Sequence, residues 1–126
     1  MTEPTTPTQL CGINIAGQYW DIVWLPATFI PDRLGHSDSA NQQIVLRANL
    51  RGMQALDTLI HEYIHSVSAI TGVAVTEEQT HMLGWAIADL WRANPELLQF
   101  AADRIAEEAD RDYQARTRAV RIAEDK

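Results

Sequence analysis

The segment Asp57–Val67 most constrains what this chain can fold into, because it carries two histidines one helical turn apart. Its pattern His61-Glu62-x-x-His65 places the imidazoles four residues apart, where helical side chains share a face with Cβ atoms about 5–6 Å apart. Both rings then reach one Zn²⁺ at about 2.0–2.1 Å, and Glu62, rotated by about 100°, reaches a metal-bound water instead. The pattern indicates metal-assisted hydrolysis in which Glu62 takes the proton of that water and passes it to the leaving amine.

The apolar residues around the motif predict that it is helical. They recur at the three-and-four spacing of a buried stripe, at Met53, Leu56, Ile60, Tyr63, Ile64 and Val67. Thr71-Gly72 predicts the helix end, since glycine supplies the positive φ of a C-terminal cap. Both histidines border the stripe, as a site in a cleft requires. The alternative interpretation is a helix flank that carries two histidines and no metal.

A catalytic zinc site has three protein ligands, so a third ligand is expected downstream. A short loop and a capping box from Thr76 to Gln79 predict a second helix folded back on the first. Glu77 is preferred over Glu78 as the ligand, because small residues that let helices approach follow it at Thr80, Gly84 and Ala88. The other glutamate would be a surface acid at the helix N-terminus. His81 is a further candidate, as a ligand, an oxyanion donor or an exposed helix residue.

The remaining segments predict an α+β domain in which a small, mostly antiparallel twisted sheet packs on the two helices. A hairpin turning at Gly17 and a strand at Gln43–Arg47 supply the sheet, and residues 32–39, with His36, form an irregular connection. Residues 1–10 are expected to be a disordered leader, 11–100 the domain, and 101–126 a charged C-terminal helical extension. This extension either packs weakly on the domain or on a partner, including a second copy, or it remains a dissociated tail.

Composition excludes several function classes. A net charge of −7 argues against a general nucleic-acid binder, which needs clustered Lys and Arg. No apolar run approaches the ~18 residues that a membrane span needs. The lone Cys11 cannot form an intramolecular disulfide, and the first residues show no secretory signal. A cytoplasmic protein without membrane or nucleic-acid partners is expected.

Several short motifs resemble the gluzincin branch of zincin-like metallopeptidases, and most closely the very small metallopeptidases encoded by bacteriophages and prophages. The resemblance covers about residues 12–96 and rests on five matches. They are Leu34-Gly35-His36-Ser37-Asp38, Ile44-Val45-Leu46, Asp57-Thr58-Leu59-Ile60-His61-Glu62, Thr76-Glu77-Glu78-Gln79 and Asn94-Pro95.

This resemblance implies a minimal zincin-like fold with a cleft between the sheet and the metal helix. It also implies that an edge strand binds an extended peptide by β-augmentation, with Ile44, Val45 and Leu46 as the substrate-binding residues. The leading hypothesis is a zinc peptidase that acts on an intracellular protein, inside the bacterial host if the chain is phage-encoded. The alternative is a non-catalytic zinc-binding interaction or regulatory protein.

Overall fold

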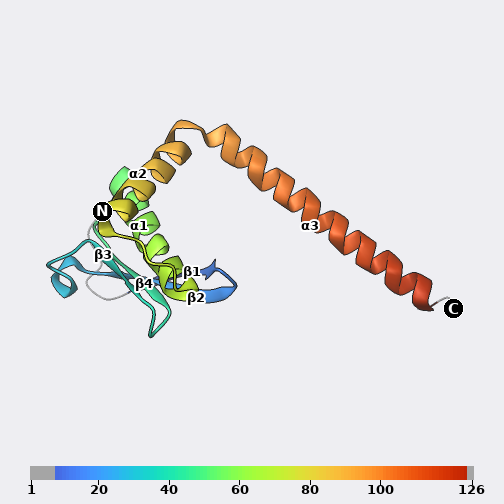
Figure 1. The fold of residues 1–126 in the computed structure, drawn as a ribbon, viewed down its shortest axis with the longest axis horizontal. Coiled ribbons are helices and arrows are strands. Elements are labelled where there is room, and N and C mark those ends of the chain that lie inside the picture. The colour runs from blue at the N-terminus through green and yellow to red at the C-terminus, as the bar shows by residue number, and fades with distance from the viewer. Residues whose placement is uncertain (1–7, 125–126) are drawn as a thin grey trace. The chain divides into compact units, whose positions relative to one another are not determined.

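The computed structural model describes residues 8–124 as an α+β arrangement of four strands and three α-helices (Figure 1). The chain divides into two compact units, one ending at Leu90 and the other beginning at Trp91. In chain order the elements are β1 (Thr8–Ile15), β2 (Gln18–Leu25), the 3₁₀ turn η1 (Ala27–Phe29), β3 (Gly35–Asp38), β4 (Gln43–Arg47), α1 (Gly52–Thr71), α2 (Glu77–Ala93) and α3 (Pro95–Glu124). Residues 8–10, which were expected in the leader, belong to β1, and residues 1–7 lie outside the described residues.

The sheet is mixed, with the strand order β1-β2-β4-β3. β1 and β2 form the expected antiparallel hairpin, and their turn contains Ala16 and Gly17 with φ of 47° and 84°. Left-handed turn residues match the twist of paired strands, and glycine adopts this conformation without steric cost. β2 is parallel to β4, whereas β3 is antiparallel to β4. Two of the three pairings are therefore antiparallel.

β4 is an internal strand, which corrects the expectation that Gln43–Arg47 forms an edge of the sheet. It lies between β2 and β3, and its Ile44, Val45 and Leu46 are at most 4% exposed. The edge strand next to β4 is β3, in a segment that was expected to be an irregular connection, and β1 forms the other edge. Glycine and aspartate are depleted in strands, so the local composition of Gly35–Asp38 conceals a strand that pairing with β4 creates.

α1 covers one face of the sheet and completes the hydrophobic core. The buried cluster consists of Ile15, Trp20, Ile22, Ile44, Leu46 and Leu50. The helix residues that pack against it are Ala55, Leu59, Tyr63, Val67 and Ile70. This face overlaps the predicted stripe at Tyr63 and Val67, but Met53 is 38% exposed and lies outside the core. The sheet therefore occupies one side of α1 and leaves the histidine side for other contacts.

The turn between α1 and α2 has the expected chemistry. Gly72 ends α1 in the left-handed conformation at φ 74°, and its N–H donates to the Ser68 carbonyl at 2.9 Å. Thr76 and Gln79 form a reciprocal capping box at the start of α2, with N–H to side-chain distances of 2.9 and 3.0 Å. These contacts satisfy backbone groups that helix ends leave unpaired. They also fix where the first turn of α2 begins.

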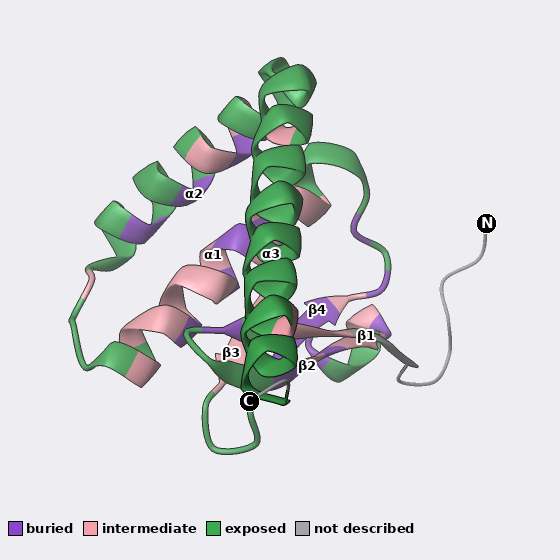
Figure 2. Cartoon of the chain, turned by 90° about the vertical axis from the view of Figure 1, so that its right-hand side faces the viewer, coloured by how far each residue is buried: buried purple, intermediate pink, exposed green. Residues whose placement is uncertain are grey.

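α3 belongs to the second unit and is a single helix of 30 residues with no buried residue (Figure 2). It begins six residues before the expected start of the C-terminal extension at residue 101. Within the described part of the chain, no helix is long and apolar enough to span a bilayer.

Candidate metal centre

His61 and His65 converge from successive turns of α1. Their ring centroids are 4.8 Å apart in a T-shaped arrangement, and their Nε2 atoms are 3.2 Å apart. Their side chains are 17% and 31% exposed, so each is shielded by the fold but open on one side. Two imidazole Nε2 atoms directed at one point are what the four-residue spacing predicts for two ligands of one ion.

Glu77 joins the two histidines from the first turn of α2. Its Oε1 lies 3.2 Å from Nε2 of His61, and both of its carboxylate oxygens lie 3.1 Å from Nε2 of His65. Partial burial raises the pKa of Glu77, but the hydrogen bond and charge of His65, followed by those of His61, outweigh it and hold this pKa below its ordinary value. The carboxylate is therefore ionised near neutral pH, as a metal ligand must be.

The three residues fit a single metal ion. Their ligand atoms all lie within 4.8 Å of one another. A tetrahedral ion about 2.0–2.1 Å from each ligand holds the ligand atoms about 3.3 Å apart, close to the 3.1–3.2 Å contacts seen between Nε2 and carboxylate atoms. Hydrogen bonding alone explains the cluster poorly, because one N–H on Nε2 of His65 cannot point at Nε2 of His61 and at both oxygens of Glu77.

Helix packing brings Glu77 to the histidines. Along α2 the buried residues are Thr80, Gly84 and Ala88, which confirms the small-residue face expected in line with Glu77. A Cβ at Gly84 would lie 3.5 Å from Oδ1 of Asp57 and 3.7 Å from the backbone nitrogen of His61. The two helices therefore meet backbone to backbone beside the first histidine, and this close approach carries the start of α2 over the site.

Glu62 lies beside the ligand set and outside it. Its Oε1 is 3.9 Å from Nε2 of His61, and the residue is 7% exposed. Burial raises the pKa of Glu62 and the Glu77 carboxylate raises it further, while the charges of His65 and Arg33 oppose the shift. A buried carboxylate with a raised pKa, next to but not within a metal-ligand cluster, has the properties of a general base.

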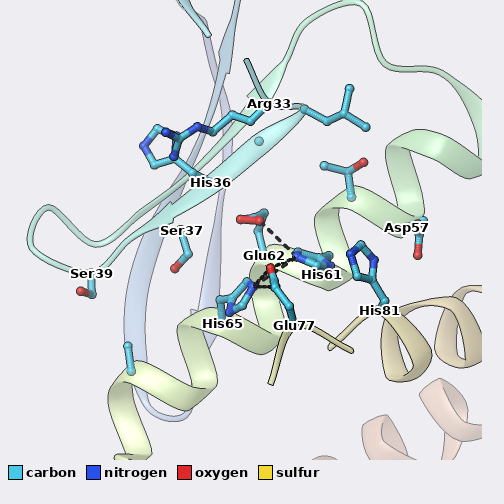
Figure 3. Close-up of a pocket in the computed structure, with 14 residues that line it drawn as sticks. Arg33, His36, Ser37, Ser39, Asp57, His61, Glu62, His65, Glu77 and His81 are labelled. Carbon is cyan, nitrogen blue, oxygen red and sulfur yellow. Dashed lines mark hydrogen bonds and ion pairs between the residues drawn. The ribbon is translucent and has the colours of Figure 1, made fainter. Parts of the chain in front are cut away.

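The cluster lies in an open cavity of about 660 Å³ (Figure 3). The cavity is bordered by α1, by the start of α2 and by β3 with its neighbouring residues. Residues from all three segments line it: Arg33, Leu34, Gly35, His36, Ser37, Ser39, Asp57, Thr58, His61, Glu62, His65, Ala69, Glu77 and His81. Ligand sites of proteins are concave and of this size. The cavity is therefore large enough for a ligand beside His61, His65 and Glu77.

Small residues hold β3 close against α1. A Cβ at Gly35 would lie 3.2 Å from Cγ2 of Thr58 and 2.7 Å from the Val45 carbonyl oxygen, so glycine permits the approach. Two residues further on, the hydroxyls of Ser37 and Ser66 share a hydrogen bond of 2.7 Å. These contacts place the wall of the cavity next to Glu62 and His65.

This wall corrects the expected substrate-binding residues. Ile44, Val45 and Leu46 do not line the cavity, and as buried residues of an internal strand they cannot pair with a peptide. The expectation failed because β4 was assigned to the edge before β3 was recognised. β3 is the edge strand that borders the site.

Of the other candidate residues, some line the cavity and one does not. Glu78 is absent from both the metal-ligand cluster and the cavity lining. His81 lines the cavity, and its ring centroid lies 4.8 Å from that of His61. His36 also lines the cavity from the edge strand, and its buried Nδ1 has no hydrogen-bond partner. Sequence reasoning did not assign Arg33 or Asp57 to the site; Asp57, four residues before His61, could have been found from helical spacing.

Comparisons with protein-family models, with curated proteins and with solved structures found no match to this chain.

Proposed function

We propose that this chain is a zinc-dependent peptidase that hydrolyses peptide bonds of a protein or peptide substrate. The observation that carries this proposal is the convergence of His61, His65 and Glu77 in an open cavity, with a buried carboxylate at Glu62 beside them. The resemblance of the His61–His65 motif and the glutamate on the following helix to gluzincins supports the same assignment.

Each residue has a definite role in the proposed reaction. His61, His65 and Glu77 would hold the ion. A zinc ion held there would supply Lewis-acid chemistry, lowering the pKa of a bound water and polarising the scissile carbonyl. Glu62 accepts the proton of the attacking water on its carboxylate and delivers it to the leaving amine nitrogen. The burial of Glu62 suits this exchange, because it raises the pKa of the carboxyl toward neutral pH, where a group both accepts and releases a proton readily.

The substrate would bind along β3 instead of β4. Among the described strands β3 pairs only with β4, so its other edge can accept an extended peptide by β-augmentation. Residues 33–37 line the cavity, and the strand is held on α1 at Gly35 and Ser37. A peptide paired with β3 would therefore pass over the metal ligands.

The test combines metal content with proteolysis of a dye-labelled unfolded protein such as casein. Wild type and Glu62→Gln should each bind one zinc, but Glu62→Gln should lose about 10²- to 10⁴-fold in cleavage rate, the usual contribution of a general base. Glu78→Gln is the matched control, because this neighbouring glutamate lies outside the cluster, and it should keep both zinc and activity. Equal cleavage by Glu62→Gln and wild type would refute the proposed role of Glu62.

A non-catalytic zinc-binding interaction protein is the second candidate. The specific observation in its favour is α3, a 30-residue helix with no buried residue, which is an element suited to binding another protein. In this case chelation would weaken partner binding, and Glu62→Gln would leave it unchanged.

A further inference from the structure

The further inference concerns α3, which exposes large apolar side chains along its length. Ile105, Tyr113 and Val120 are 68%, 66% and 56% exposed, and no residue of this helix is buried. Helices in proteins derive most of their stability from packing one apolar face. A 30-residue helix with no buried residue therefore has an apolar face that could pack against another protein surface.

Six of the apolar residues of α3 form one stripe, and five of these six are arranged symmetrically along the helix. The stripe comprises Leu98, Ala102, Ile105, Ala109, Tyr113 and Val120, spaced three, four or seven residues apart as on one helix face. Ala109 is at its centre: Ile105 and Tyr113 each lie four residues from it, and Leu98 and Val120 each lie eleven residues from it. If two such helices cross antiparallel at Ala109, Ile105 meets Tyr113 and Leu98 meets Val120, with small residues where the backbones come closest.

The symmetry of the stripe points to a second copy as the occupant, and charge along α3 favours the antiparallel direction. Residues 96–112 carry six acidic and two basic side chains, whereas residues 113–124 carry three arginines and one glutamate. In an antiparallel pair that crosses at Ala109, residues 113–124 of one helix lie beside residues 94–105 of the other, which carry Glu96, Asp103 and Arg104. A parallel copy would place the three arginines of one helix beside the same three arginines of the other, which is unfavourable.

We propose that α3 binds the α3 helix of a second copy of this chain, in an antiparallel pair that crosses at Ala109. This interface is independent of the metal centre, because it uses none of the residues around the cavity. The overlap between Leu97 and Arg121 is about 36 Å long at 1.5 Å per residue, enough for several helical turns of contact.

The first experiment measures the mass of the full-length protein by sedimentation equilibrium over a range of concentrations. Wild type should form a dimer, and Ile105→Ser with Tyr113→Ser should raise its dissociation constant by roughly a hundredfold or more, since both side chains lose their burial in each copy. A monomer at every concentration, or a dimer that the double variant does not weaken, would overturn the proposal.

Disulfide trapping then tests the direction of the pair in a Cys11→Ser background. Ala109→Cys should crosslink to itself under mild oxidation, because the two copies meet there. Leu98→Cys should not, since an antiparallel pair keeps the two copies of this residue about 33 Å apart. Gln114→Cys, on the opposite face of the helix, is the control for random collision. Crosslinking of Leu98→Cys in preference to Ala109→Cys would mean a parallel pair and would refute the proposed direction.

Discussion

Nε2 of His65 lies 3.1 Å from the carboxylate of Glu77, although the two residues are on different helices and are separated by the helix end at Gly72. Two residues from one helix cannot complete a site with three protein ligands. The turn between α1 and α2 is therefore a functional part of the candidate metal centre, because it decides which side chain of α2 faces the histidines.

Removal of the Glu77 side chain should abolish tight metal binding, and removal of the Glu78 side chain should not. Loss of a residue that only orients a ligand typically costs 10- to 100-fold in metal affinity, so Glu77→Ala should cost more than about a hundredfold. Glu78→Ala is the matched control, because both residues are exposed in the same helical turn. Zinc affinities from a competing chelator dye measure both effects, and equal losses in the two variants would contradict the assignment of Glu77.

Two substitutions at Gly84 should have opposite effects, because one changes only the stability of α2 and the other prevents α2 from lying close to α1. Its Cβ would make ordinary contacts at 3.5 Å or more, so Gly84→Ala should stabilise the fold by about 0.5–1 kcal/mol through the lower entropy of alanine in the unfolded chain. Gly84→Leu cannot fit between α2 and His61 and should displace the first turn of α2, with loss of zinc. Thermal unfolding and metal content are the measurements. Full zinc affinity in Gly84→Leu would show that close approach is not what positions Glu77.

The candidate metal centre was largely predictable because its determinants are local in sequence. The spacing of His61 and His65 fixes their shared face, and the cap at Gly72 and the capping box from Thr76 fix the turn. Glu77 then follows from the small residues in line with it along α2. Each step needed only one helix or one short loop, so no long-range pairing had to be guessed.

The sheet was less predictable because its order depends on pairings between distant segments. The hairpin of β1 and β2 is local and was predicted, whereas β3 exists only because β4 pairs with it. Gly35–Asp38 lacks the β-branched and aromatic residues that indicate a strand. Missing this strand moved the edge to β4 and led to the wrong substrate-binding residues.

Gly35 should be sensitive to even the smallest side chain. A Cβ there would lie 2.7 Å from the Val45 carbonyl oxygen, which is backbone and cannot move independently of β4. Gly35→Ala should therefore destabilise the protein by about 1–3 kcal/mol, the usual cost of overpacking. Ser39→Ala, at an exposed position of the same cavity, should change stability by less than about 0.5 kcal/mol. Urea unfolding measures both, and a neutral Gly35→Ala would mean that β3 is not held tightly on the sheet.

The metal-free protein should become more stable when Glu62 is replaced by glutamine, and this gain should depend on pH. Burial raises the pKa of Glu62 in the folded protein above the ordinary value of 4.5, so between these two pKa values the folded state binds a proton that the unfolded state has lost. Stability of wild type therefore falls as the pH rises through this interval, whereas Glu62→Gln has no charge to bury. Chemical unfolding of both proteins in the presence of chelator should show the largest gain at pH values above the raised pKa of Glu62 and a shrinking gain as the pH falls toward 4.5. A difference that stays constant over this range would assign the effect to packing or hydrogen bonding of the amide and not to the buried charge.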